Sequence, residues 1–426
     1  MKQLPSLLVS DRAGNLFDIP DTEMAGKSGR TIHPVQAHDL IPLPGGSQVF
    51  MMPERSAIGF DRRTGRRKNF KDYFAVAAYI PPSYTHLAMA AYGMTERAPR
   101  LPLMSFTAVG WYRGRMYVPA VHIDREIKHL PTSFDDNIVS NKVEAMVSKY
   151  PHNRLIAHHG RQCAVEYGCA NAKNFFLQRW EAPIAVAGGC NANCIACISF
   201  QPSSSVPSPQ ERIPFLPTVE EIVEMAVVHL ITAPKAIVSF GQGCEGEPLL
   251  QGPRIEKALR EIRRQTRKGV LHLNTNGSRP TVLAKLFDAG LDSVRISLNS
   301  VQPELYHRYY KPNNYSFEDV RESLRVARTM NKYTSMNYFV FPGITDSKKE
   351  AAALMRLFRT ARPNLIQWRN FNIDPEWYLT EVCHDYRSPR LGVKKLMFLI
   401  QKKFPDIQFG YNNKAASVIH KSKEAA

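Results

Sequence analysis

The apolar positions of the chain follow two different patterns, and the change between them comes near residue 130. Before that point, short apolar runs such as 6–10 and 16–19 are separated by turn residues such as 11–15. Runs of this kind, bounded by Gly, Pro, Asn and Asp, predict the strands of an antiparallel module. We therefore expect residues 1–130 to form a β-rich N-terminal domain that recognises a substrate or serves as a scaffold.

From residue 182 onward, short apolar runs alternate with amphipathic stretches. Thr218 and Glu221 have the spacing of a capping box and predict the start of a helix. The alternation itself predicts an α/β fold with a parallel sheet. Amphipathic spacing also predicts a linker helix over 135–150 and a C-terminal helix over 393–403. The expected strands are 183–187, 236–240, 270–274, 293–298, 336–341 and 365–369.

The composition favours an intracellular protein with a large core. The chain has 426 residues, of which 44% are hydrophobic, and no apolar run long enough for a membrane span. Its first residues lack the apolar segment of a signal peptide. The number of cysteines is seven, which is odd, and three of them are clustered, which argues against a disulfide framework. We expect a cytoplasmic location without membrane association.

The net charge of +18 leaves two interpretations open. Such a charge attracts acidic partners, among them nucleic acids, but it also simply keeps a protein soluble. One basic cluster contains aromatic residues, as single-stranded nucleic-acid sites do, although a solvated turn has the same composition. This cluster consists of Arg62, Arg63, Arg66, Arg67, Lys68, Phe70, Lys71 and Tyr73.

Three cysteines, Cys190, Cys194 and Cys197, lie in one glycine-led loop after the strand expected at 183–187. Thiolates select zinc, copper(I) or iron–sulfur clusters. A structural zinc site normally has four protein ligands, and here only three are close in sequence. A cubane cluster with one open iron fits that number. Buried reduced thiols, or a zinc site completed by Cys169 or a distant histidine, remain alternatives.

This C-x3-C-x2-C loop resembles that of radical S-adenosylmethionine (radical SAM) enzymes. The resemblance implies a [4Fe–4S] cluster on Cys190, Cys194 and Cys197, with S-adenosylmethionine on the open iron. It also implies reductive cleavage of that cofactor to a 5′-deoxyadenosyl radical, and a partial (β/α)6 TIM-type barrel. One departure is Ala196, where the family usually has an aromatic residue; Phe200 is a candidate substitute.

We expect the chain to consist of four consecutive segments. They are the β-rich domain (1–130), a linker helix with a Cys/His segment (131–181), the barrel (182–380) and a C-terminal extension (381–426).

Further motifs at predicted strand ends resemble the family's cofactor contacts. Residues 241–248 are similar to its Gly-Gly-Glu-Pro motif, which contacts the methionine amino group, with Glu245 in place of the first glycine. The cofactor-binding residues implied in this way are Glu245, Gly246, Glu247, Pro248, Asn276, Arg295, Ser297, Asn299 and Gly343. Ser297 and Asn299 are expected to contact the ribose or the methionine carboxylate, Arg295 to neutralise that carboxylate, and Gly343 to flank the adenine.

The remaining cysteines have two possible roles. Cys244 and Cys383 are candidate catalytic residues that donate a hydrogen atom to a substrate radical, or they are unreactive thiols. Cys163 and Cys169 follow a histidine pair and form, with Cys244 or Cys383, a candidate second cluster or metal site. Buried thiols beside a surface histidine pair are the favoured explanation of this stretch, because its spacing matches no zinc-binding pattern.

Three functions are compatible with these features. The first is a radical SAM enzyme acting on a peptide or protein, which a separate N-terminal domain can hold. The second is an RNA-modifying radical SAM enzyme, which the charge favours. The third is a non-catalytic iron–sulfur scaffold or regulatory protein. An enzyme of this kind needs an electron donor such as flavodoxin or ferredoxin.

Overall fold

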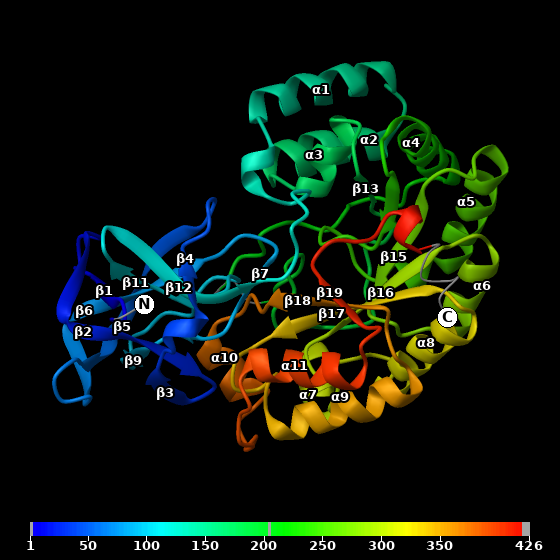
Figure 1. Cartoon of the computed structure of the whole chain (residues 1–426). Helices are drawn as coiled ribbons and strands as arrows, with labels where there is room; N and C mark the ends of the chain where they lie inside the picture. Colours follow the sequence, from blue (N-terminus) through cyan, green and yellow to red (C-terminus); the bar gives the residue numbers. More distant parts are fainter. Residues whose placement is uncertain (1–2, 203–205, 420–426) are drawn as a thin grey trace. The chain divides into compact units, whose positions relative to one another are not determined.

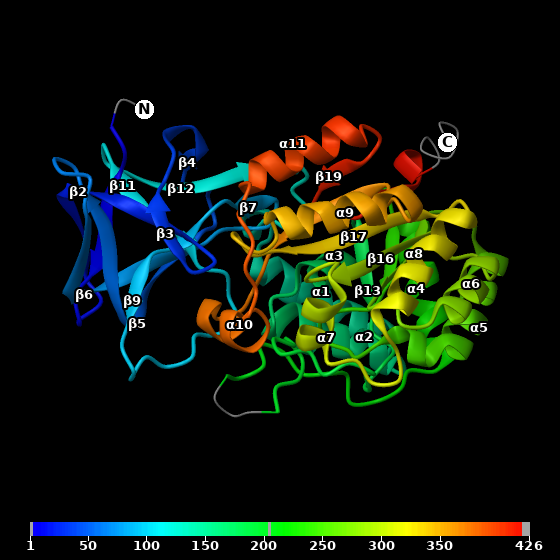
Figure 2. The same ribbon diagram turned by 90° about the horizontal axis from the view of Figure 1, so that it is seen from below.

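The computed structural model describes residues 3–202 and 206–419, and Figures 1 and 2 show it from two sides. The chain forms two compact units that are not continuous in sequence. Unit 1 contains Met1–Arg125, Phe339–Ala353 and Trp368–Pro405, whereas unit 2 contains Glu126–Tyr338, Leu354–Gln367 and Asp406–Ala426. This division differs from the four consecutive segments expected from the sequence, because two later stretches group with the N-terminal residues.

The N-terminal part of unit 1 is a twelve-stranded sheet with antiparallel pairing, in agreement with the predicted β-rich segment. Alternate residues of a strand point to opposite faces. In the first strand, Leu7 and Val9 accordingly pack in one apolar cluster with Met52, while Leu8 packs in another with Val118. The strands are β1 (Ser6–Ser10), β2 (Leu16–Ser28), β3 (Thr31–Pro34), β4 (Leu40–Pro42), β5 (Gln48–Asp61), β6 (Arg67–Tyr79), β7 (Tyr84–His86), β8 (Met89–Ala90), β9 (Tyr92–Met94), β10 (Thr107–Ala108), β11 (Gly110–Tyr112) and β12 (Arg115–His122).

Two residues of the basic cluster stabilise the tight turn between β5 and β6. Arg62 donates to the carbonyl oxygens of Pro20 (2.6 Å) and Leu4 (2.9 Å). Lys68 forms an ion pair with Asp61, with 2.5 Å between Nζ and Oδ2. These two cations therefore have structural partners, and the charge that remains for an external ligand is smaller than the sequence suggests.

The second sheet has seven strands in sequence order. The pairings from β13 to β17 and between β18 and β19 are parallel, as the alternating pattern predicts. The strands are β13 (Glu181–Ile184), β14 (Ile237–Phe240), β15 (Val270–Thr275), β16 (Ser293–Leu298), β17 (Tyr333–Val340), β18 (Leu365–Asn370) and β19 (Gln408–Gly410). The seventh strand, β19, was not expected from the sequence because it is only three residues long.

Helices connect these strands, and Figure 1 shows α4, α5, α6 and α8 along the outside of β13–β16. The predicted capping box is present: Thr218 accepts from the Glu221 amide (3.2 Å), and Glu221 accepts from the Thr218 amide (2.8 Å). The helices are α4 (Val219–Thr232), α5 (Gly252–Gln265), α6 (Pro280–Asp288), α7 (Pro303–Tyr310), α8 (Phe317–Thr329), α9 (Lys348–Thr360), α10 (Pro375–Glu381) and α11 (Val393–Lys403).

A small helical layer precedes β13 in unit 2. It contains α1 (Asp136–Lys149), α2 (Arg154–His158), a π-helical segment (His159–Glu166) and α3 (Ala170–Phe176). The predicted linker helix corresponds to α1, whose Val139 and Val143 are buried as the spacing requires. Short 3-10 helices span Ala37–Asp39, Pro131–Ser133 and Pro248–Gln251. Among the helices of the described ranges, none has both the length and the apolarity needed to cross a bilayer.

Candidate active site

The cysteine loop, residues 188–197, starts after Ala185–Ala187, which continue β13 and are fully buried. Cys190, Cys194 and Cys197 are all free thiols with partial exposure. A loop that leaves a rigid, buried strand end can present its side chains at a fixed position. Three partly exposed thiols on one loop fit the requirement of a cluster that needs three thiolates and an accessible fourth iron.

The end of α7 holds this loop in place through backbone hydrogen bonds. The amides of Asn193 and Ile195 donate to the carbonyl oxygens of Tyr310 (2.9 Å) and Tyr309 (3.0 Å). The amide of Asn313 donates to the carbonyl oxygen of Asn191 (2.9 Å). The last carbonyls of a helix have no partner within it, so they are available to bind another segment. Sequence reasoning missed this support because backbone contacts require no particular side chain.

The turn after β14, residues 241–248, joins the cysteine loop on another side. The Gly246 amide donates to Ala187 O (2.6 Å), and the Glu247 amide donates to Gly189 O (3.0 Å). Gly246 has no space for a side chain, because a Cβ there would lie 1.8 Å from Gly189 O. The structure thus brings together the two motifs that the sequence analysis singled out.

The carboxylates of this turn are buried and accept several hydrogen bonds. Glu245 accepts from the amides of Val186 (2.7 Å), Ala187 (3.0 Å) and Gln242 (2.5 Å). Burial raises the pKa of Glu245 to about 8, although these amide donors oppose the rise. The residue that replaces the family's first glycine therefore fixes the strand end that precedes the cysteine loop.

Glu247 connects the same turn to the end of β15. Its carboxylate accepts from the amides of Leu249 (3.0 Å) and Asn276 (2.8 Å) and from the Thr275 hydroxyl. Burial raises the pKa of Glu247 to about 7. Because both oxygens already have protein donors, its contribution in this structure is to position the turn; the contact with a methionine ammonium stays a prediction.

A cationic side chain lies beside the cluster cysteines. The Cys197 sulfur lies 3.7 Å from Nη2 of Arg212 and 3.5 Å from the Ser199 hydroxyl. Burial raises the pKa of the Cys190 thiol to about 11, with the Glu247 carboxylate adding to the effect. Thiolates in such a site require a compensating positive charge, and the Arg212 guanidinium is placed to supply part of it. Arg212 was not predicted, because it is remote from every motif.

Comparison with protein families agrees with this geometry. Residues 184–355 match the model of the radical SAM superfamily. Residues 184–355 therefore form a radical SAM domain. This domain begins in β13 and contains both the cysteine loop and the turn 241–248.

Two curated proteins that the chain resembles are GTP 3′,8-cyclases. The one from Limosilactobacillus fermentum is 27% identical over 168 residues, which are 39% of this chain and 47% of that protein. The one from Microcystis aeruginosa is 27% identical over 177 residues, which are 41% of this chain and 51% of that protein. The chain thus spans about half the length of the curated relatives it matches. Among solved structures, methylornithine synthase aligns with a TM-score of 0.37 and 15% identity, covering 64% of this chain and 77% of that chain.

Other predicted cofactor residues of the radical SAM domain lie at the ends of β15 and β16. Asn276 donates from Nδ2 to Asn191 Oδ1 (2.9 Å), so the structure brings it to the cysteine loop. Ser297 accepts from Asn337 (3.0 Å), and Asn299 donates to Leu305 O (3.1 Å). Pro248 is buried at the start of the 3-10 helix that leaves the turn.

Arg295 contacts the interior of the second sheet. Its Nη1 donates to Oε1 of Gln367 at 3.1 Å, and Gln367 in turn donates to Asn413 (2.9 Å). Its charge also acts on Glu181: burial raises the pKa of that carboxyl, but neighbouring histidines, the Ser239 hydroxyl and Arg295 leave it below the ordinary value. The role of Arg295 toward a cofactor carboxylate stays a prediction.

Cys244 is almost fully buried and has a thiol neighbour, with 3.7 Å between its Sγ and that of Cys163. The hydrogen bond with Cys163, followed by burial, raises the pKa of Cys244 well above its usual range. Its predicted role as a hydrogen-atom donor stays untested, and its surroundings are those of a paired, buried thiol.

Gly343 and Cys383 belong to unit 1. Gly343 has φ +94°, and a Cβ there would lie 2.3 Å from the Gly29 amide nitrogen, so the β2–β3 turn packs directly on it. The Cys383 thiol is fully buried, while its carbonyl oxygen accepts from Arg30 Nη1 (3.1 Å). Within unit 1 both residues have packing roles; their predicted contacts with adenine and substrate remain predictions.

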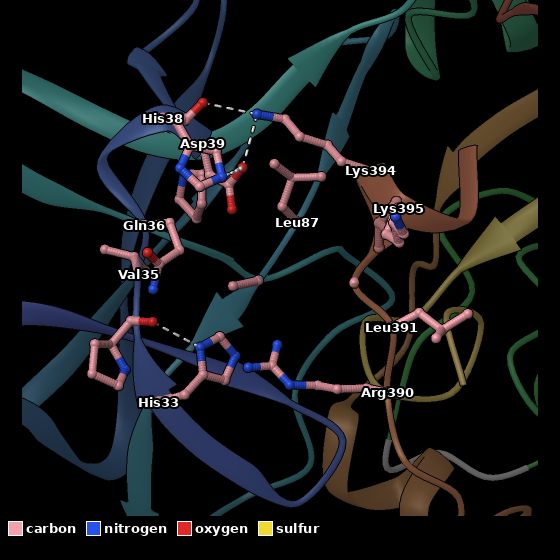
Figure 3. Close-up of a pocket in the computed structure, with 15 residues that line it drawn as sticks. His33, Val35, Gln36, His38, Asp39, Leu87, Arg390, Leu391, Lys394 and Lys395 are labelled. Atoms are coloured by element: carbon pink, nitrogen blue, oxygen red, sulfur yellow. Dashed lines mark hydrogen bonds and ion pairs between the residues drawn. The ribbon is translucent and has the colours of Figure 1, made fainter. Parts of the chain in front are cut away.

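Unit 1 also contains a basic surface pocket, shown in Figure 3. In it, Lys394 lies 2.8 Å from both His38 O and Asp39 Oδ1, and the His33 ring faces Arg390. Lys395 and Gln36 complete the polar lining. None of the residues predicted from the sequence to bind cofactor or cluster lines this pocket.

Proposed function

We propose that this protein holds a [4Fe–4S] cluster on Cys190, Cys194 and Cys197 and cleaves S-adenosylmethionine reductively to modify a substrate. When bound, the reduced cluster supplies the electron and the open coordination site for that cleavage, which yields a 5′-deoxyadenosyl radical. The proposal rests on two backbone hydrogen bonds that join the turn to the cysteine loop. Gly246 donates to Ala187 at the strand end, and Glu247 donates to Gly189 in the loop.

The protein's own part is to orient the cofactor and keep the site rigid. Gly246 lets the turn approach the cysteine loop, and Asn276 anchors the loop from β15. The turn offers backbone groups at the carboxyl end of a parallel strand, which is where α/β sheets bind ligands. This arrangement, with strands in sequence order, supports the finer proposal of a partial (β/α)6 barrel.

For the substrate, we propose a peptide or protein, because unit 1 supplies a large β-rich module in addition to the radical SAM domain. A nucleotide is the second candidate, favoured by the similarity to GTP 3′,8-cyclases. RNA is weakened as a third candidate because Arg62 and Lys68 already have protein partners. A non-catalytic iron–sulfur scaffold would hold the cluster without cleaving the cofactor. We further propose a cytoplasmic location and an electron donor such as flavodoxin or ferredoxin.

Anaerobic reconstitution tests the function. The wild-type protein should hold about four iron and four sulfide per chain. With dithionite and S-adenosylmethionine it should release 5′-deoxyadenosine, measured by mass spectrometry. Adding a peptide pool, GTP or RNA in separate reactions should raise the yield only for the correct substrate class. A fully loaded protein that releases no 5′-deoxyadenosine in any of these reactions would support the scaffold instead.

A further inference from the structure

A second cluster of soft ligands lies in unit 2, outside the cysteine loop. Each of His159, Cys163 and Cys244 offers a ligand atom, and these atoms all lie within 4.8 Å of one another. The three residues are 0%, 1% and 4% exposed. Buried groups of this kind need a partner that replaces water.

The chain builds this cluster from two segments far apart in sequence. His159 and Cys163 are four residues apart in the π-helical segment His159–Glu166, which places them on one face. π-helical turns are rare and occur frequently at functional sites. Cys244 comes from the turn after β14. Its sulfur lies 3.7 Å from that of Cys163 across a sequence separation of 81 residues.

Two imidazole nitrogens of the adjacent histidines lack a hydrogen-bond partner in the described structure. They are Nδ1 of His159 and Nε2 of His158, and both are buried. The other nitrogen of His159, Nε2, accepts from the Ala185 amide at 3.2 Å. The two rings have their centroids 5.8 Å apart. A fully buried histidine with an unpaired nitrogen, next to two thiols, indicates a candidate metal ligand.

We propose that Cys163, Cys244 and His159 bind a zinc ion, with the neighbouring His158 as the candidate fourth ligand. Thiolate and imidazole are the ligands that zinc prefers in structural sites. Two zinc–sulfur bonds of about 2.3 Å at a tetrahedral angle place the sulfurs about 3.8 Å apart. The observed Sγ–Sγ distance of 3.7 Å already matches this value.

Zinc binding changes the protonation of all three ligands. Zn²⁺ displaces the two thiol protons into solvent and takes the lone pair of His159 Nδ1. The ring proton moves to Nε2, and the Ala185 amide gives up its long hydrogen bond. No oxidation or reduction is involved.

Such an ion ties the π-helical segment to the turn that positions the cysteine loop. Cys244 immediately precedes Glu245, whose carboxylate holds the amides of Val186 and Ala187. The zinc is therefore structural, and its presence does not depend on whether the protein cleaves S-adenosylmethionine.

Cobalt(II) substitution tests the site directly. In a C190A/C194A/C197A background, which removes the cysteine loop's own thiols, one equivalent of Co²⁺ should give thiolate charge-transfer and tetrahedral d–d absorption. The added substitution C163S or C244S should abolish these bands. C383S, which alters a buried cysteine of unit 1, is the matched control and should leave them intact. Circular dichroism verifies that each variant is folded.

Metal content of the otherwise wild-type chain gives a second, independent measurement. Protein purified anaerobically should contain one zinc per chain, and C163S or C244S should lose the zinc while keeping the iron of the reconstituted cluster. Absence of zinc from the wild type together with absence of cobalt bands would overturn the proposal. So would cobalt bands that persist in both C163S and C244S. Loss of 5′-deoxyadenosine formation alone would bear on the proposed function and not on this site.

Discussion

The contact between Gly246 and the cysteine loop allows a sharp test of how the site is built. In a Gly246→Ala variant, the new Cβ would lie 1.8 Å from the carbonyl oxygen of Gly189 and 2.3 Å from its carbonyl carbon. Both atoms belong to the backbone and cannot rotate away. The turn and the loop must therefore separate, which breaks the hydrogen bonds from Gly246 N to Ala187 O (2.6 Å) and from Glu247 N to Gly189 O (3.0 Å).

The size of this effect follows from the interactions lost. Two backbone hydrogen bonds contribute about 1 kcal/mol each, and overpacking a tight contact costs about 1–3 kcal/mol. The expected loss is therefore about 3–5 kcal/mol, which for a unit of this size lowers the melting temperature by about 6–20 °C. The matched control is Gly189→Ala, since no described atom lies within 4 Å of a Cβ at that position.

Differential scanning calorimetry of the cluster-free protein measures both variants against the wild type. Iron content after anaerobic reconstitution measures whether the loop still assembles a cluster. We expect Gly246→Ala to melt earlier and to hold little iron, and Gly189→Ala to behave as the wild type. If Gly246→Ala melts at the wild-type temperature and holds a full cluster, the turn does not support the loop in the way described.

Three further predictions concern charge. Asp374→Ala in unit 1 leaves the buried Arg55 guanidinium without its carboxylate partner, which lies 3.0 Å away, with the two side chains 1% and 3% exposed. Calorimetry should show that the free energy of unfolding falls by about 3–5 kcal/mol. Glu256→Ala breaks an ion pair on the surface and should lower it by less than about 1 kcal/mol. Burial lowers the pKa of His229 to about 4, whereas the unfolded chain protonates this histidine near pH 6.5. The stabilisation from the neutral buried ring is therefore complete above pH 6.5 and is lost as the pH falls toward 4. The melting temperature of the wild type should fall over this range, and that of His229→Gln should depend less on pH. Arg212→Gln removes the cation 3.7 Å from the Cys197 sulfur and should lower the midpoint potential of the reconstituted cluster in an EPR-monitored titration. Arg212→Lys keeps a positive charge and should have a midpoint potential close to that of the wild type. An unchanged potential in both variants would show that Arg212 does not act on the cluster.

The sequence predicts those parts of the fold that depend on local side-chain patterns. The Thr218–Glu221 capping box and the helix Val393–Lys403 are found as predicted, because caps and amphipathic faces depend on residues that are close in sequence. The meeting of the cysteine loop with the turn at Gly246 also followed, since the carboxyl ends of parallel strands share one edge of a sheet.

What could not be predicted depends on the backbone or on contacts distant in sequence. The support that Tyr309 and Tyr310 give to the cysteine loop uses their carbonyl oxygens, which every residue has. The approach of Cys163 to Cys244 joins a helical layer to a strand end, and no spacing rule connects them. Arg62 belongs to a basic cluster that suggested nucleic-acid binding, yet its guanidinium binds the protein's own carbonyl oxygens.

The most direct measurement of the central claim is the absorption and EPR spectrum of reconstituted C190A/C194A/C197A protein beside the wild type. The wild type should show the brown colour near 400 nm and, after dithionite, the signal of a reduced [4Fe–4S] cluster that changes when S-adenosylmethionine is added. The triple variant should show neither. A cluster signal of wild-type strength in the triple variant, or a wild-type signal that S-adenosylmethionine leaves unaltered, would contradict the account.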